Sequence, residues 1–408
     1  MSMINWKAES LGAVADMTTD KISVNKLSIE NYISTENMLP DRGGVAIASK
    51  LPTSGSINAF FPGDVLFSNI RTYFKKVWLA QRHGGASADV IVFRPKDCQK
   101  VDSQYLYYVL SSDAFIESTV IASKGTKMPR GDKDAMLRYM MPLPPLPIQQ
   151  RIAGILSAYD ELIENSQRRI KLLEAMARAL YREWFVHFRF PGHENHPRVP
   201  SPLGEIPQGW EVKAVAEAFT ISGGGTPSRK ESAYWEGGTI QWYSPSDLTG
   251  AGTMFMDDSS DHITERGLEQ SSARMFPPRS VMLTSRATIG AIAINTHPAC
   301  TNQGFITCLP NKHVPLYFLF HWLTENVPTF QLMASGATFK EISRGVFKTI
   351  DFLQPPIELV EQFEAHATPL AEQILSLQRQ VNNLRRTRDL LLPRLLSGQI
   401  DVKTIPYA

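Results

Sequence analysis

The sequence predicts an α+β protein in which a β-rich globular domain followed by one long helix occurs twice. Two observations lead to this prediction. An ordered series of motifs recurs after about 204–216 residues, and each series ends in a double proline followed by a long heptad pattern. The length agrees, because 408 residues correspond to two or three domains. With 43% hydrophobic and 20% charged residues, the composition is that of a globular protein.

The first half of each copy consists of a tryptophan with an aliphatic residue five positions later, an aromatic-proline strand signal leading to an arginine, and a further strand. In the first copy these segments are Trp6 to Leu11, residues 61–71 and residues 90–95. Their counterparts are Trp210 to Val215, residues 276–286 and residues 305–310. This alignment matches Arg71 with Arg286.

The second half of each copy contains an apolar helical stretch, a turn rich in glycine and lysine, and the double proline. In the first copy these are residues 105–110, residues 124–127 and Pro144-Pro145. Their counterparts are residues 317–322, residues 336–340 and Pro355-Pro356. Because the order of the motifs is preserved throughout, the sequence indicates an internal duplication.

After each double proline, apolar residues recur at alternating steps of four and three, as in the seam of a coiled coil. The first seam is Ile152, Leu156, Tyr159, Ile163, Ser166, Ile170, Leu173, Ala177, Leu180 and Trp184. The second seam is Phe363, Ala367, Leu370, Ile374, Leu377, Val381, Leu384, Arg388, Leu391 and Leu395. Pro369 lies within the second run, so it should kink that helix or mark its start.

A helix of about 40 residues is about 60 Å long and must bury its apolar stripe. The helix of the other copy is the expected partner; the alternative is that each helix packs on its own globular domain. The predicted boundaries are a globular domain over 1–143, a helix over 144–190, a linker over 191–206, a second domain over 207–353, a second helix over 354–400 and a tail over 401–408.

His187, His193 and His196 lie in or near the linker without metal-ligand spacing, so we expect solvated histidines and no metal site.

The chain lacks the common catalytic and nucleotide-binding motifs. The segment Gly223-Gly224-Gly225-Thr226-Pro227 has no P-loop lysine, which leaves a loop that approaches a ligand closely or an ordinary turn. No Rossmann fingerprint, amino-methyltransferase tetrapeptide, H-E-x-x-H or G-x-S-x-G motif is present. These observations argue against an enzyme that acts alone and predict no catalytic residues. A nuclease would need a carboxylate cluster, for which Asp257, Asp258 and Asp261 are the candidates, although an ordinary polar loop is the favoured explanation for them.

The cysteine content and the absence of long apolar segments indicate the cellular compartment of the protein. The three cysteines, Cys98, Cys300 and Cys308, have no metal-ligand spacing, and the chain has no signal peptide or long apolar run. We therefore expect a cytoplasmic protein.

The net charge is only +2, so a nucleic-acid surface would have to come from local clustering of cations. Basic and polar side chains do recur in loops of both copies, as reading of DNA requires. The candidates are Arg71, Lys75, Lys76, Lys124, Lys127, Arg130, Arg229, Lys230, Tyr243, Ser285, Arg286, Thr338, Lys340 and Arg344. For any single residue, the alternative is an ordinary solvated side chain.

Taken together, these motifs resemble the specificity subunit of Type I restriction-modification systems. The resemblance rests on Trp6 to Gly12, residues 221–228, residues 235–242, Ser285 to Gly290, Asn302 to Phe305, and the run from Pro144 to Pro191 with Arg182-Glu183-Trp184-Phe185. It covers nearly the whole chain. The first domain departs from the pattern more than the second, because it lacks the Gly-Thr-Pro-Ser and Thr-Ile-Gly elements.

The resemblance implies two target recognition domains, related by a pseudo-twofold axis, whose helices pair as an antiparallel coiled coil. Each domain would read one half of a bipartite double-stranded DNA target. The helices would set the spacing and dock two methylation subunits, which carry the S-adenosylmethionine site and modify adenine. Restriction subunits with ATP and Mg²⁺ would join them, and this chain would bind no cofactor itself. The competing hypothesis is a coiled-coil scaffold that binds protein or glycan ligands.

Overall fold

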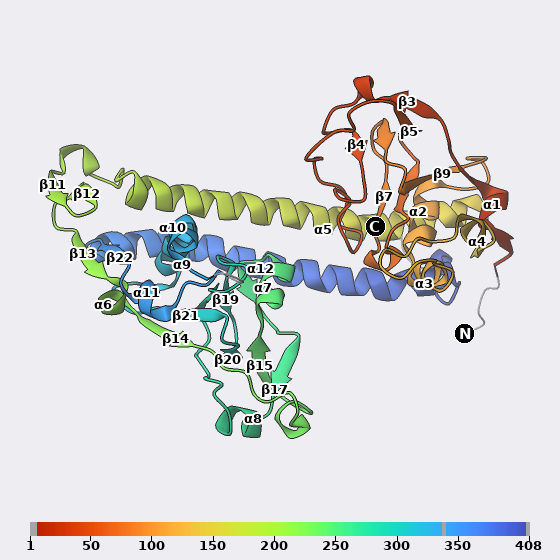
Figure 1. The fold of residues 1–408 in the computed structure, drawn as a ribbon. Helices are drawn as coiled ribbons and strands as arrows, with labels where there is room; N and C mark the ends of the chain where they lie inside the picture. The colour runs from red at the N-terminus through yellow and green to blue at the C-terminus, as the bar shows by residue number, and fades with distance from the viewer. Residues whose placement is uncertain (1–5, 337–339, 405–408) are drawn as a thin grey trace. The chain divides into compact units, whose positions relative to one another are not determined.

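A computed structural model describes residues 6–336 and 340–404 of the chain (Figure 1). The chain forms two compact units. Unit 1 contains Met1–Ile163 and Asn383–Ala408, and unit 2 contains Glu164–Asn382. Two long helices, α5 (Leu146–Tyr181) and α12 (Ile357–Leu396), each begin in one unit and end in the other.

Unit 1 contains two four-stranded sheets and one two-stranded ribbon. The first sheet has the order β2 (Ala15–Met17), β9 (Val90–Pro95), β6 (Val65–Ser68) and β7 (Val77–Leu79). The second has the order β3 (Lys21–Ser23), β5 (Ser56–Phe60), β8 (Gly84–Ala86) and β4 (Tyr32–Ile33). The ribbon pairs β1 (Ala8–Ser10) with β10 (Met140–Pro142). All four residues of β6 are buried, as expected of a central strand covered on both faces.

The helices of unit 1 begin where a polar side chain caps a free backbone N–H. Before α2 (Ser103–Ser111), the Asp102 carboxylate accepts a hydrogen bond from the Tyr105 N–H. Ser112 caps α3 (Asp113–Ile121) and Asp132 caps α4 (Lys133–Leu137) in the same way. These helices, with α1 (Leu11–Val14), pack on the first sheet around a core that includes the fully buried Phe67 and Phe93.

Unit 2 is built on the same plan, with one strand more in its larger sheet and one strand fewer in its smaller sheet over the described residues. Its larger sheet has the order β14 (Thr220–Gly223), β21 (Phe305–Leu309), β18 (Val281–Thr284), β19 (Ile292–Asn295) and β16 (Phe255–Met256). A smaller sheet has the order β17 (Asp261–Ile263), β15 (Ile240–Tyr243) and β20 (Ala299–Thr301), and β13 (Glu211–Ala214) pairs with β22 (Asp351–Gln354). The helices are α6 (Val215–Ala218), α7 (Pro245–Ala251), α8 (Glu265–Glu269), α9 (Leu316–Glu325), α10 (Val327–Met333) and α11 (Arg344–Lys348).

The shared topology confirms the predicted fold class, two repeated β-rich domains each followed by a long helix. The order β2-β9-β6-β7 of unit 1 recurs as β14-β21-β18-β19 of unit 2, and the ribbon β1-β10 recurs as β13-β22. One detail of the sequence alignment is wrong. The cap residues Asp102 and Pro315 are equivalent, so Tyr105 matches Phe318 and not Tyr317.

The segment predicted as a plain linker has structure of its own. Within the predicted helix of residues 144–190, α5 ends at Tyr181 and a π-helical turn (Arg182–Val186) follows it. The linker predicted over 191–206 holds a 3₁₀ turn (His193–Asn195) and nearly all of a hairpin of β11 (Arg198–Ser201) and β12 (Gly204–Pro207). Gly204 has a φ of +95°, a conformation that glycine adopts without steric cost. His193 and His196 each place a ring nitrogen 2.8 Å from a backbone carbonyl oxygen.

The two long helices pack antiparallel within each unit. In unit 1, Ile152 and Leu156 of α5 share a core with Leu392 and Leu395 near the end of α12. In unit 2, Tyr181 at the end of α5 lies with its ring 5.8 Å from that of Phe363 near the start of α12.

Every predicted seam residue is buried or half-buried. The same cores include residues of the globular domains, so the helices pack on each other and on the domains together. Helix α12 runs through Pro369 from Ile357, so that proline does not mark its start. None of the described helices combines the length and apolar content needed to cross a membrane.

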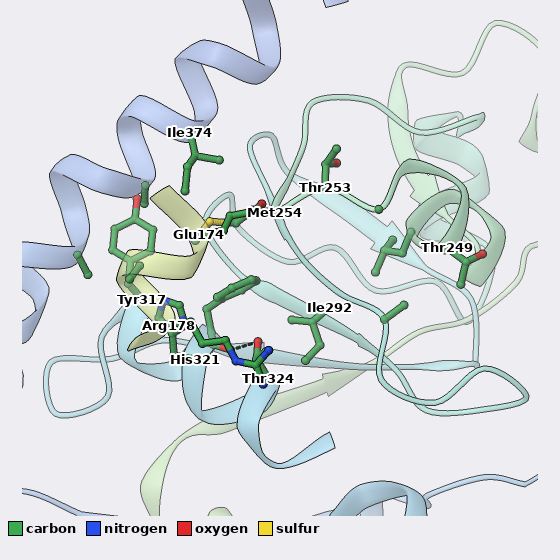
Figure 2. A pocket seen from close by; sticks show the side chains of 17 residues that line it. Glu174, Arg178, Thr249, Thr253, Met254, Ile292, Tyr317, His321, Thr324 and Ile374 are labelled. Atoms are coloured by element: carbon green, nitrogen blue, oxygen red, sulfur yellow. Dashed lines mark hydrogen bonds between the residues drawn. The ribbon is translucent and has the colours of Figure 1, made fainter. Parts of the chain in front are cut away.

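A cavity of about 390 Å³ lies in unit 2 beside the helix pair (Figure 2). Its walls come from α5, α9, α12 and the segment that follows α7, and they are mainly apolar. Glu174, Arg178, Tyr317 and His321 are the titratable side chains among the lining residues.

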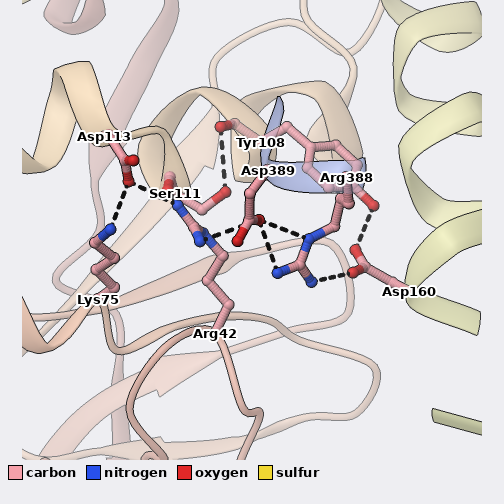
Figure 3. Close-up of polar contacts among 8 residues, drawn as sticks. All are labelled: Arg42, Lys75, Tyr108, Ser111, Asp113, Asp160, Arg388 and Asp389. Carbon is pink, nitrogen blue, oxygen red and sulfur yellow. Dashed lines mark hydrogen bonds and ion pairs between the residues drawn. The ribbon is translucent and has the colours of Figure 1, made fainter. Parts of the chain in front are cut away.

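Unit 1 instead contains a polar cluster where α5, α12 and α2 meet (Figure 3). The Arg388 guanidinium Nη1 lies 2.6 Å from the Asp160 carboxylate, and the Tyr108 hydroxyl donates to the same carboxylate over 2.6 Å. Arg42 completes the cluster with ion pairs of 3.0 Å to Asp113 and 3.4 Å to Asp389. Arg388, the one charged seam residue, is thus a partnered side chain within unit 1.

Candidate nucleic-acid interface

Unit 1 brings four of its predicted cations together at the turn that follows β6. The Arg71 N–H donates to the Pro129 carbonyl oxygen at 2.9 Å, and the Arg71 guanidinium donates to the Lys127 carbonyl oxygen at 3.2 Å. Lys124 and Arg130 exchange two backbone hydrogen bonds of 2.9 Å across the same loop. Arg71, Lys124, Lys127 and Arg130 therefore form one surface, cation cluster 1.

The charges of this cluster are accessible. Lys124 pairs with Asp132 at 2.7 Å and Arg130 with Asp89 at 3.0 Å, but their side chains are 82% and 55% exposed. Hydrogen bonding to Lys124 lowers the pKa of Asp132 to about 2. Such exposed ion pairs contribute little to stability, so phosphate groups can compete for the cations. Lys127 is exposed and has no ion pair among the residues that the structure describes.

Lys75 and Lys76 do not join the cluster. The Lys75 ammonium lies 2.7 Å from the Asp113 carboxylate, and the Lys76 ammonium donates to the Thr35 carbonyl oxygen at 2.7 Å. Partial burial lowers the pKa of Lys76. Both side chains are occupied by contacts within unit 1, which argues against their role as DNA contacts.

Unit 2 repeats the arrangement at the turn that follows β18. Ser335 and Glu341 exchange backbone hydrogen bonds of 3.0 and 2.9 Å, and the Ala287 N–H donates to the Lys340 carbonyl oxygen at 3.0 Å. Arg286 and Lys340 lie on this loop pair with exposed side chains, and we call them cation cluster 2. Thr338 lies outside the described residues.

The two arginines of these turns are not equivalent, which corrects the alignment. The left-handed residue of the first turn is Arg71, with a φ of 49°, and that of the second is Ala287, with a φ of 62°. Strands β6 and β18 both end three residues before these positions. Arg286 therefore matches Ile70.

Two predicted DNA contacts are core residues. Tyr243 has an exposed fraction of 0%, and its hydroxyl donates to the Gln241 side chain at 2.8 Å. Ser285 is 2% exposed. Its backbone N–H donates to the Gly304 carbonyl oxygen, and its carbonyl oxygen accepts from the Ile342 N–H. DNA cannot reach either side chain without local unfolding, because both side chains are buried.

Arg229 and Lys230 follow the glycine-rich segment in the chain, and Arg344, the first residue of α11, packs against that segment. The Arg229 guanidinium stacks 3.6 Å from the Trp235 ring centroid and pairs with Asp261 at 2.5 Å. Lys230 is exposed. A Cβ on Gly223 would lie 2.2 Å from the Arg344 guanidinium, and one on Gly224 would lie 2.0 Å from the Asn302 carbonyl oxygen. Gly224 is therefore required because backbone oxygen atoms pack against it, whereas the neighbour of Gly223 is the end of a flexible side chain.

A family model described as the Type I restriction modification DNA specificity domain matches residues 5–175 and 207–366. The chain belongs to this family. The two matched ranges correspond to the two copies of the fold, and each includes the beginning of a long helix. Membership of this family implies that the chain is a DNA-recognition subunit and disfavours the protein- or glycan-binding scaffold.

Individual relatives agree with this membership. The chain is 25% identical to the Type I restriction enzyme MjaIX specificity subunit of Methanocaldococcus jannaschii, over 98% of this chain and 94% of that protein. It is 23% identical to the Type I restriction enzyme HindI specificity subunit of Haemophilus influenzae, over 98% of this chain and 100% of that protein. Its fold is similar to the crystal structure of the Type-I restriction-modification system S subunit from M. genitalium, with a TM-score of 0.62, 16% identity and 96% of each chain covered.

The acidic residues that suggested a nuclease are held apart by different partners. Asp257 forms two hydrogen bonds of 2.7 and 2.9 Å with Arg379, which hold the pKa of its carboxyl below the usual range. Asp258 contacts His262 at 2.8 Å and Asp261 pairs with Arg229. Over the described ranges, no three His, Cys, Asp or Glu side chains are grouped so that they could hold a metal ion.

The sequence did not reveal which side chains surround Arg388, the charged residue of the second seam. The heptad pattern identified Arg388 as the only charged seam residue, and a buried charge requires a partner. Asp160 and Tyr108, which supply that partner, lie on α5 and α2 and carry no signal of their own in the sequence.

Proposed function

We propose that this chain is the specificity subunit of a Type I restriction-modification complex, in which each recognition domain reads one half of a bipartite DNA target. The observation that carries the proposal is the repetition of one fold with an exposed, basic loop pair at the equivalent turn of each copy. Phosphate groups are bound by such cations, and base edges are read by side chains placed beside them.

The paired helices would determine the spacing between the two half-sites and dock two methylation subunits. Two linked readers gain effective concentration only when the spacing of the half-sites matches the protein. S-adenosylmethionine would bind to the methylation subunits, and ATP with Mg²⁺ to the restriction subunits. This chain would act without a cofactor and without a catalytic residue, in the cytoplasm.

The test is a methylation assay of the purified complex on a split target of known sequence. Methylation should be lost when the spacer is lengthened by a few base pairs, because one recognition domain would then miss its half-site. Methylation that continues at every spacer length would contradict the proposed role of the helices. Absence of both DNA binding and methylation would instead favour a protein-binding scaffold.

The same assay tests the proposed domain boundaries. Exchange of residues 207–353 for those of a relative should change one half-site and leave the other intact. A change in both half-sites would show that the two domains do not read independently.

Replacement of Lys127 by alanine should weaken DNA binding about fivefold at 0.15 M salt and reduce the salt slope by about one, as expected for one lost phosphate contact. Lys127 is the suitable choice because its side chain is exposed and is not engaged in an ion pair among the described residues. A filter-binding or anisotropy titration at several salt concentrations measures both quantities.

Lys26→Ala is the matched control, because Lys26 is an exposed lysine of unit 1 outside cation cluster 1. An equal loss for Lys26→Ala and Lys127→Ala would argue against cation cluster 1 as the DNA surface.

A further inference from the structure

The polar cluster of unit 1 and the cavity of unit 2 occupy equivalent places in the two copies. Helices α2 and α9 begin after the cap residues Asp102 and Pro315, so Tyr108 and His321 are equivalent. Helices α5 and α12 both begin two residues after the first proline of a double proline. In that register Asp160 matches Ala371, and Arg388 matches Ala177.

In unit 1 this place is filled by three side chains, two of which bind the carboxylate of the third. Tyr108 is 3% exposed, and its hydroxyl donates to Asp160, which also binds Arg388 (Figure 3). Arg388 is 7% exposed. Each buried polar group therefore has a partner, as stable packing requires.

In unit 2 the corresponding partners are missing. His321 is 4% exposed, and neither of its ring nitrogens has a hydrogen-bond partner among the described residues. Because alanines stand at positions 177 and 371, the side chains that would meet His321 are absent. The space that results is the cavity of about 390 Å³ (Figure 2), a volume typical of sites for small molecules.

The chemistry of the lining residues favours one class of ligand. Glu174 is half-buried, has no hydrogen bond or ion pair among the described residues, and burial raises the pKa of its carboxyl. Arg178 also lines the cavity, but its guanidinium Nε lies 2.6 Å from the Glu325 carboxylate, which offsets its charge. The rings of Tyr317 and Phe320 and the side chain of Ile374 supply apolar walls.

We propose that this cavity binds a small organic cation, an amidinium, guanidinium or ammonium group on a compact apolar body. The cationic group meets the unpaired Glu174 carboxylate, and the apolar body fills the space left by Ala177 and Ala371. In unit 1 the equivalent space is filled by a guanidinium that the chain itself supplies through Arg388. Burial lowers the pKa of His321 to about 4, so its ring is neutral at pH 7 and offers one acceptor nitrogen to an N–H donor. This site lies outside the cation clusters, and its occupancy does not depend on DNA reading.

The test is an isothermal titration of the full chain with benzamidine and, separately, with benzamide, its uncharged counterpart of nearly the same shape. Benzamidine should bind, and benzamide should bind about tenfold more weakly, because one charge-assisted hydrogen bond is lost. Glu174→Gln should remove the difference between the two compounds. Glu361→Gln, which changes an exposed glutamate of α12 outside the cavity, should preserve it.

A second variant tests the location of the site. Ala177→Arg combined with Ala371→Asp copies the pair of unit 1 into unit 2 and should abolish binding of both compounds. The proposal is overturned if benzamidine does not bind at about 10 mM, if both compounds bind the wild type equally, or if the filled variant binds as the wild type does.

Discussion

Replacement of Arg388 by methionine should lower the free energy of unfolding of unit 1 by about 3 kcal/mol, because it leaves a largely buried carboxylate without its cation. The Arg388 side chain is 9% exposed and that of Asp160 is 30% exposed, so solvent screens the pair only in part. Hydrogen exchange of α2 and of the first half of α5, measured together with urea unfolding, reports the local loss of stability.

Two further variants define the cause of that loss. Arg386→Met is the matched control, since Arg386 is an exposed arginine on the same helix, and it should change stability by less than about 0.5 kcal/mol. Asp160→Leu combined with Arg388→Met should recover part of the loss, because no unpaired charge remains. If Arg388→Met is no more harmful than Arg386→Met, the ion pair does not stabilise the helix pair.

Replacement of Phe363 by alanine should destabilise unit 2 by about 4 kcal/mol, as expected for truncation of a fully buried phenylalanine. Phe363 is 0% exposed and its ring centroid lies 5.2 Å from that of Phe185 and 5.8 Å from that of Tyr181. It joins the start of α12 to the end of α5, so its loss should loosen the helix pair as well as the core. Urea unfolding followed by tryptophan fluorescence measures the change.

Leu332→Ala is the control for this prediction, because Leu332 is 85% exposed in the same unit. It should alter stability by less than about 0.5 kcal/mol. A loss for Phe363→Ala as small as that of the control would mean that the aromatic contacts in unit 2 do not hold the two helices together.

The fold could be predicted from the sequence because it depends on local motifs and on the periodic spacing of apolar residues. The double prolines lie immediately before the two long helices, and the heptad steps correspond to residues that are buried or half-buried in the structure. The duplication was visible because it repeats motifs in order. The alignment of motifs was nevertheless shifted by one residue at Arg286 and at Tyr317. Short insertions change the sequence spacing between strands and helices, although tertiary packing keeps those elements equivalent.

The candidate DNA surface could be predicted only in part from the sequence. Residue type and loop position identified Arg71, Lys124, Lys127 and Arg130, which the structure gathers on one surface. The same criteria selected Tyr243, which faces the sheet interior. Exposure depends on which face of a strand meets the core, and a short strand of mostly apolar residues does not reveal that face.

By itself, the sequence determined that the chain contains two similar copies, that each copy ends in a long amphipathic helix, and that one seam position carries a charge. Only the tertiary structure decided which side chains meet. It paired Arg388 with Asp160, separated by 228 positions in the chain, and left the equivalent place in unit 2 open beside His321. The physical reason is that periodicity follows from backbone geometry within one helix, whereas a hydrogen bond or a cavity depends on side chains that distant segments bring together.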